Sequence, residues 1–196
     1  GEIDMYQGQP TADSVALLKL IGSRIKIYGG TSSCFEHVDL RIDAAAGTDT
    51  PYTGPWQGMS TKAKELRQAF LMAYPRQKIV TDLVKPVNSK AVVVNSSFTL
   101  PGQAGYDAIV KGSGVSSWTT GTQASRAAAA LAIVKKYYPS ATASSPAVDV
   151  RMLWGRLDNQ RRASEFAIVK SEMAKAGFNV TNPTYTGSWG ANLDNA

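Results

Sequence analysis

The chain has 196 residues, of which 43% are hydrophobic and 18% charged, as in an ordinary globular domain and unlike a disordered segment. Twenty-one basic and 15 acidic residues give a formal net charge of +6, so the surface is basic. No stretch approaches the roughly 18 apolar residues of a membrane span. One cysteine, Cys34, excludes an internal disulfide, and one histidine, His37, excludes a His-cluster metal site. We therefore expect one domain over residues 1–196, without a metal or cofactor.

The two ends of the chain suggest that it is a piece of a longer protein. The sequence begins at Gly1 without a methionine and without the charged and apolar regions of a signal peptide. It stops at Ala196 without a helix cap or a closing strand pattern. We expect the parent chain to be longer, so the missing targeting signal does not bear on its location.

The first part of the chain predicts one helix and two strands. Residues 11–20 form a short helix in this prediction, with Thr11 or Asp13 as its N-cap. Residues 25–28 predict a short strand that ends at two glycines. Residues 35–42 alternate and predict a second strand. Its apolar face holds Val38, Leu40 and Ile42, and its polar face holds His37, Asp39 and Arg41.

The middle of the chain predicts two helices and a long loop. Residues 60–73 have helical spacing of apolar side chains, and the spaced residues are Leu66, Ala69, Phe70 and Ala73. Pro75 fits the first turn of a second helix, which Pro86 ends. Residues 91–94 are a short β-branched stretch. Residues 95–121 are rich in Ser, Gly and Thr, and long loops of this kind are often functional.

The last part of the chain alternates helices with strands. Residues 123–138 predict an alanine-rich helix, and residues 148–154 predict a strand. Residues 159–176 predict the most strongly amphipathic helix, with Gly177 as its C′ residue. Residues 178–180 then begin another strand. The alternation favours an α/β layered domain with a mixed sheet flanked by helices.

Motifs for catalysis and nucleotide binding are missing from the sequence. It has no GxxxxGK[ST] phosphate loop, no GxGxxG after a strand and no GxSxG nucleophile elbow. Cys34 and His37 could form a Cys–His pair, but three residues apart on a strand they point to opposite faces. A Cys-dependent enzyme remains one alternative function. His37 belongs either to a solvated face or to a face that lines a cleft.

The positive charge leaves a basic nucleic-acid-binding module as the second alternative function. The densest basic cluster lacks an aromatic ladder and consists of Arg151, Arg156, Arg161 and Arg162. A dispersed, solvated basic surface explains this pattern better. The four tryptophans either cover the edge of the core or line a ligand site. They are Trp56, Trp118, Trp154 and Trp189.

Three segments together resemble the family 5 extracellular solute-binding proteins, which are the oligopeptide- and dipeptide-type receptors of bacterial ABC importers. The first is Gly1-Glu-Ile-Asp-Met5, followed by a proline-containing turn and a short helix. The most specific runs from Leu66 to Val80, LRQAFLMAYPRQKIV, and is similar to the family's helix pair LRqAlayAiDRdaIv. The third is residues 148–180. Pro75 departs from this pattern, because the family usually has Asp there.

The resemblance covers essentially the whole chain and implies a type II periplasmic-binding-protein-like fold of two α/β lobes that close over a ligand. This chain resembles the second, C-terminal lobe. The implied function is capture of a peptide or similar small solute, without catalysis, and delivery to the ABC permease subunits. The implied partners are the ligand, the permease and the N-terminal lobe of the same chain, with no nucleic acid. The implied location is the extracellular face of the membrane, with a lipid anchor, or the periplasm.

The same resemblance suggests which residues face the ligand. Trp189 matches a tryptophan that flanks bound side chains in peptide receptors. Gly155 and Arg156 match the loop after the strand that faces the ligand, and Trp154 ends that strand. Phe35 and His37 fall on the strand that enters the cleft. Trp189 offers apolar area with one donor, and Arg156 offers a fork for a carboxylate. Related receptors take peptides, nickel chelates, haem or sugars, so the resemblance does not name the ligand.

Overall fold

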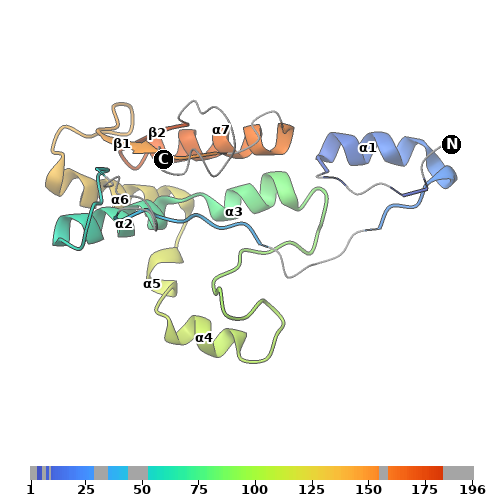
Figure 1. Ribbon diagram of the computed structural model, residues 1–196, viewed down its shortest axis with the longest axis horizontal. Helices are drawn as coiled ribbons and strands as arrows, with labels where there is room; N and C mark the ends of the chain where they lie inside the picture. Colours follow the sequence, from blue (N-terminus) through green and yellow to red (C-terminus); the bar gives the residue numbers. More distant parts are fainter. Residues whose placement is uncertain are drawn as a thin grey trace.

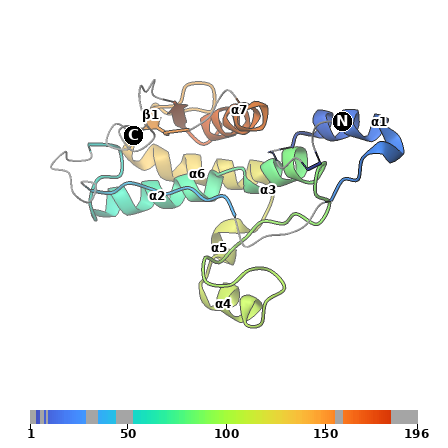
Figure 2. The same ribbon diagram turned by 45° about the vertical axis from the view of Figure 1, so that its right-hand side comes forward.

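The structure is a computed structural model that describes residues 4, 5, 8, 10–28, 35–43, 53–154 and 159–182. This part of the chain is rich in helices and contains a small parallel sheet of two strands. The elements in chain order are α1 (Ala12–Leu20), η1 (Gly22–Arg24), α2 (Thr61–Ala73), α3 (Arg76–Ile79), η2 (Val80–Val84), α4 (Tyr106–Gly112), α5 (Ser116–Thr119), α6 (Gln123–Tyr137), β1 (Val148–Arg151), α7 (Gln160–Ala174) and β2 (Phe178–Thr181). Figures 1 and 2 show α7 and the two strands as one layer over a second layer made by α2 and α6.

Helices α2 and α6 lie side by side and form one wall of the core (Figure 1). The side chain of Ser60 caps α2 by accepting from Ala63 N, and that of Thr122 caps α6 by accepting from Ser125 N. The helical spacing predicted for residues 60–73 is confirmed, because its four apolar side chains are all buried. They are Leu66, Ala69, Phe70 and Ala73. On α6 the buried face is Ala127, Ala130 and Val134.

The second layer is a strand–helix–strand unit, in the order that the sequence predicted. Strand β1 pairs with β2 in parallel, with Val148 opposite Phe178 and Val150 opposite Val180. Helix α7 connects them and packs on β2. Gly177 has a φ of +87° between α7 and β2, where a side chain would be strained.

The core forms where α2 and the strands meet. Phe70 contacts Trp56 and Phe178 at ring-centroid distances of 5.1 Å and 5.4 Å, both in edge-on geometry. Val169 and Met173 of α7 are fully buried in the same cluster. The core therefore holds together segments that are far apart in the sequence.

The predicted sheet is larger than the observed one. Residues 25–28 and 35–42 are not strands, and the described sheet is parallel and not mixed. Residues 35–42 do run with Val38 and Leu40 packed against the core, but Ile42 is exposed. The prediction that Val38 and Leu40 face the core is therefore confirmed. The described residues provide no hydrogen-bonded neighbouring strand, which a strand at 35–42 would require. Residues 91–94 are likewise without a strand.

Two segments differ from their predictions in detail, and a third agrees. The helix predicted after Pro75 begins as α3, widens into the π-helical turn η2 and ends two residues before Pro86. The long loop 95–121 contains the short helices α4 and α5. Helix α1 is confirmed with Thr11 as its N-cap, and none of its residues is buried. Among the described helices, none combines the length and apolar character that crossing a membrane requires.

Candidate functional site

Three of the six predicted ligand-facing residues lie outside the described part of the chain. They are Gly155, Arg156 and Trp189, and Cys34 also lies outside it. Their predicted roles, and the pairing of Cys34 with His37, stay predictions. The other three, Phe35, His37 and Trp154, are described.

Phe35 and His37 lie together on the segment 35–43. Their rings are 6.0 Å apart, and His37 Nδ1 lies 3.1 Å from Asp39 Oδ1. The side chain of His37 is 60% exposed, which fits the interpretation of this face as solvated. Neither residue lines either of the two cavities described below.

Trp154 lies just after β1 and is 8% exposed. Its ring contacts Phe166 of α7 at 5.7 Å, and its backbone N–H donates to Asn182 Oδ1 at 2.9 Å. The indole Nε1–H is buried and has no acceptor among the described residues. An unpartnered buried donor is unfavourable, so Trp154 retains a polar group that an acceptor would stabilise.

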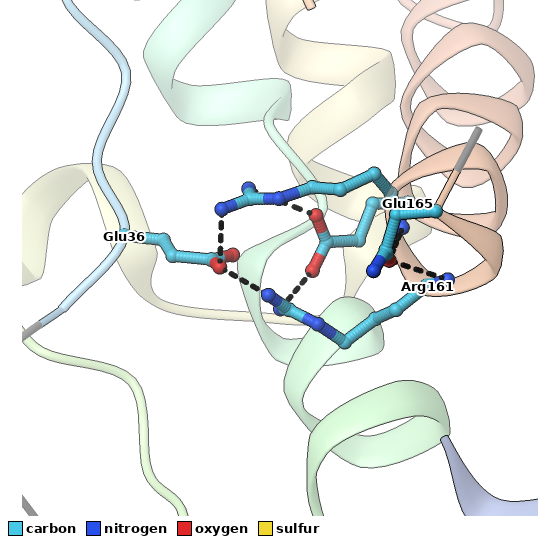
Figure 3. Close-up of polar contacts among 5 residues, drawn as sticks. Glu36, Arg161 and Glu165 are labelled. Carbon is cyan, nitrogen blue, oxygen red and sulfur yellow. Dashed lines mark hydrogen bonds and ion pairs between the residues drawn. The ribbon is translucent and has the colours of Figure 1, made fainter. Parts of the chain in front are cut away.

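A cluster of two carboxylates and two guanidiniums joins segment 35–43 to α7, and we call it the Glu36–Glu165 clamp (Figure 3). Arg161 lies 2.7 Å from Glu36 and 2.6 Å from Glu165, and Arg162 lies 2.9 Å and 3.3 Å from the same two carboxylates. The spacing of Arg161 and Glu165 along one helix predicts their contact. Glu36 comes from 125 residues away, and no local pattern indicates its place.

The two carboxyl groups of the clamp, those of Glu36 and Glu165, differ in pKa. Burial, followed by the negative charge of Glu36, raises the pKa of Glu165 to about 7. Burial also acts to raise the pKa of Glu36, but the hydrogen bond and charge of Arg161 and the charge of Arg162 outweigh it and lower that pKa. Since both arginines are held by carboxylates, the basic cluster predicted around them is largely neutralised at this point.

A second pair of arginines lines an open cavity of about 250 Å³, which we call the arginine cavity. Its lining residues come from the end of α2, the start of α3, the 93–95 stretch and the start of α6; they are Leu71, Met72, Tyr74, Arg76, Gln77, Val93, Asn95, Thr119, Gly121 and Arg126. Arg76 and Arg126 are both half-buried. They are 50 residues apart in sequence, and the packing of α2 against α6 brings their segments together.

The guanidiniums of the arginine cavity contact only neutral groups in the described structure. Arg76 donates to Asn95 Oδ1 at 3.0 Å and to Val94 O at 3.4 Å. Arg126 donates to Gly121 O and to Gln123 Oε1, both at 2.8 Å. No carboxylate of the described residues pairs with either arginine, in contrast to the clamp.

The electrostatics of the arginine cavity favour an anion. Burial, followed by the positive charge of Arg126, lowers the pKa of Arg76. Two half-buried like charges without a counter-ion are unfavourable, and an anion between them would relieve both the repulsion and the lost solvation. Arginine forks bind carboxylate and phosphate oxygens in fixed geometry. The first turn of α6, which borders the cavity, carries no acidic residue to compete.

Tyr74 connects the arginine cavity to the clamp. It lines the cavity, and burial, followed by the charges of Glu165 and Glu36, raises the pKa of its hydroxyl. The charges of both clamp carboxylates therefore act on a residue that lines the cavity. The described residues offer no group of three or more side chains that could hold a metal ion.

Comparisons with known proteins find no relative of this chain. Neither protein families, nor curated proteins, nor solved structures give a significant match to this chain.

Proposed function

We propose that this chain is a solute-binding lobe that captures a small anionic solute, such as a peptide carboxylate, for an ABC importer. The observation that carries the proposal is the arginine cavity, where Arg76 and Arg126 face a solvent-accessible space without a carboxylate partner in the described residues. Such a site binds an anion by charge-assisted hydrogen bonds and needs no bond-making chemistry.

Two further features support the lobe assignment. The strand–helix–strand unit of β1, α7 and β2 is a building block of α/β lobes. The indole N–H of Trp154 has no acceptor among the described residues, and it lies outside the lining of the arginine cavity at a position where the family resemblance implies ligand contact. In the proposal the chain is the second lobe of a two-lobed type II protein on the extracellular face or in the periplasm. A ligand held by both lobes would stabilise the closed form, which presents the solute to the permease.

The proposal is tested by binding measurements on the chain itself. Thermal unfolding and calorimetric titration are run with succinate, short unblocked peptides, inorganic phosphate and a short DNA duplex. A carboxylate at 100 times its dissociation constant adds about 2.7 kcal/mol to the free energy of unfolding. We expect the carboxylates to bind and Arg76→Gln to weaken them about 10- to 100-fold, because a charge-assisted hydrogen bond contributes about 1.5–3 kcal/mol.

Arg151→Gln is the matched control, because Arg151 is an exposed arginine at the end of β1, away from the arginine cavity. Its affinities should equal those of the wild type. Binding of the duplex with a steep salt dependence, and not of carboxylates, would replace the proposal with the nucleic-acid-binding alternative. Equal losses in both variants would show that net charge alone, and not the cavity, attracts the ligand.

A further inference from the structure

A second open cavity adjoins the arginine cavity, and we call it the tryptophan pocket. Its volume is about 260 Å³, and its lining residues are Met72, Ser117, Trp118, Thr120, Ser125, Arg126 and Ala129. Met72 and Arg126 line both cavities, so the two spaces are neighbours across these side chains. Its lining residues come from α2, α5, α6 and the turn between α5 and α6. Helix α2 contacts both α5 and α6, and Figure 2 shows α5 below these two helices.

The tryptophan pocket has an apolar wall, and two of its rim hydroxyls already have acceptors. Trp118, Met72 and Ala129 supply an aromatic ring, a thioether and a methyl group. The hydroxyl of Ser117 donates to Gly114 O at 2.8 Å, and that of Ser125 donates to Thr122 O at 2.9 Å. These two hydroxyls therefore leave little demand for a polar ligand group, and the charge at the rim is that of Arg126, which also lines the arginine cavity. An enclosed apolar cavity of about 150 Å³ binds benzene, so the volume of this open pocket is sufficient for a phenyl or branched aliphatic group.

The exposure of Trp118 also favours an apolar occupant. Trp118 is 38% exposed, whereas Phe98, another aromatic residue of the 95–121 segment, is 90% exposed and lines neither cavity. A ligand group packed on Trp118 would remove part of its exposed apolar surface from water, which is favourable in proportion to the area covered. Phe98 offers no such concave surface and serves as a comparison.

The shared side chains fix how the two ligand groups are arranged. Because Arg126 borders both spaces, an anion between Arg76 and Arg126 lies next to the entrance of the tryptophan pocket. An apolar group reaches Trp118 only if it is attached within a few bonds of the anion. An ammonium group at the same place would be repelled by both guanidiniums.

We propose that the preferred ligand is a carboxylic acid that carries an aromatic or branched aliphatic group close to the carboxylate and no cation beside it. The carboxylate lies between Arg76 and Arg126, and the apolar group packs on Trp118. This inference rests on the proposed function, since it assigns the ligand class of the same anion site.

The test compares three matched probes by calorimetric titration. They are N-acetyl-phenylalanine, its amide, and N-acetylglycine. N-acetyl-phenylalanine has both groups, the amide lacks the charge, and N-acetylglycine lacks the apolar group. We expect N-acetyl-phenylalanine to bind at least 10-fold more tightly than either of the others.

Two variants locate the binding groups. Trp118→Ala should reduce the affinity for N-acetyl-phenylalanine about 10-fold without changing that for N-acetylglycine, and Phe98→Ala should change neither. Arg76→Gln should weaken both acids, and Arg76→Lys, which keeps the charge, should restore part of the binding. Unfolding curves without ligand confirm that each variant folds.

The outcomes separate this inference from the proposed function. Equal affinities for N-acetyl-phenylalanine and N-acetylglycine, both lowered by Arg76→Gln, would overturn the inference and leave the anion site in place. Equal affinities for the acid and its amide would overturn both, because the charge would then contribute nothing. No binding of any carboxylate would also overturn both.

Discussion

Replacing Glu165 by Gln should remove most of the pH dependence of stability between pH 5 and pH 8. In the folded chain the pKa of Glu165 is raised from 4.5 to about 7, by burial and then by the charge of Glu36 (Figure 3). A carboxyl whose pKa is higher in the folded state binds its proton more tightly there than in the unfolded chain. The free energy of unfolding therefore falls as the pH rises from about 4.5 to about 7, and levels off above that.

The size of this fall follows from the displacement of the pKa. Each tenfold change in proton affinity corresponds to about 1.4 kcal/mol, so a rise from 4.5 to about 7 corresponds to roughly 3–4 kcal/mol at most. Glu165 is 1% exposed, but the side chain of its neighbour Glu36 is 45% exposed, and solvent screens part of their repulsion. We expect a fall of about 2 kcal/mol in the wild type.

The assay is urea unfolding at a series of pH values for three proteins. In the wild type the stability should decline between pH 5 and pH 7, and in Glu165→Gln it should be nearly flat over that range. Glu172→Gln is the control, since Glu172 lies further along α7, is 8% exposed and pairs with Lys175 at 2.8 Å. The control should keep the wild-type decline. A decline of equal size in Glu165→Gln, or a wild-type stability that rises with pH, would refute this account of the clamp.

Two further substitutions test the α7–β2 unit by urea unfolding. Gly177→Ala should lower the free energy of unfolding by about 1–3 kcal/mol, because φ is +87° and the added Cβ would lie 3.0 Å from Leu131 Cδ1 and 3.1 Å from Val134 Cγ1. A loss below about 0.5 kcal/mol would show that this turn relaxes more easily than the geometry implies. Asn159→Ala should lower the free energy of unfolding by about 1 kcal/mol, because the Asn159 side chain caps α7 by accepting from the backbone N–H groups of Arg161 and Arg162. Asn159→Asp should retain most of the stability, and a loss equal to that of the alanine variant would contradict the capping role.

The helices were predictable because their evidence is local. The apolar side chains of α2 recur within about two helical turns, from Leu66 to Ala73. The capping residues Ser60 and Thr122 each stand directly before the helix that they cap. The predicted strand at 35–42 failed for the opposite reason. Its alternation shows correctly that Val38 and Leu40 face inward, but a strand also needs a hydrogen-bonded neighbour, which tertiary contacts supply.

The arginine cavity was not predictable from the sequence for a similar reason. Arg76 lies in the segment that carries the family resemblance. Arg126 lies in an alanine-rich helix, where the sequence pattern alone indicates only an exposed charge. Only the packing of α2 on α6 brings the two guanidiniums to one space. Trp154, by contrast, was singled out by its place after a strand, and the structure adds the information that its indole donor is buried without an acceptor among the described residues.

The two arginine pairs of this chain provide an internal comparison that bears on function. Arg161 and Arg162 meet two carboxylates, so their charges are balanced within the fold. Arg76 and Arg126 meet only amide and carbonyl oxygens in the described structure. A pair needed for stability alone would be expected to be neutralised as the first pair is, because half-buried like charges repel each other. In the proposed function, the ligand anion supplies the counter-charge that none of the described residues provides at the arginine cavity.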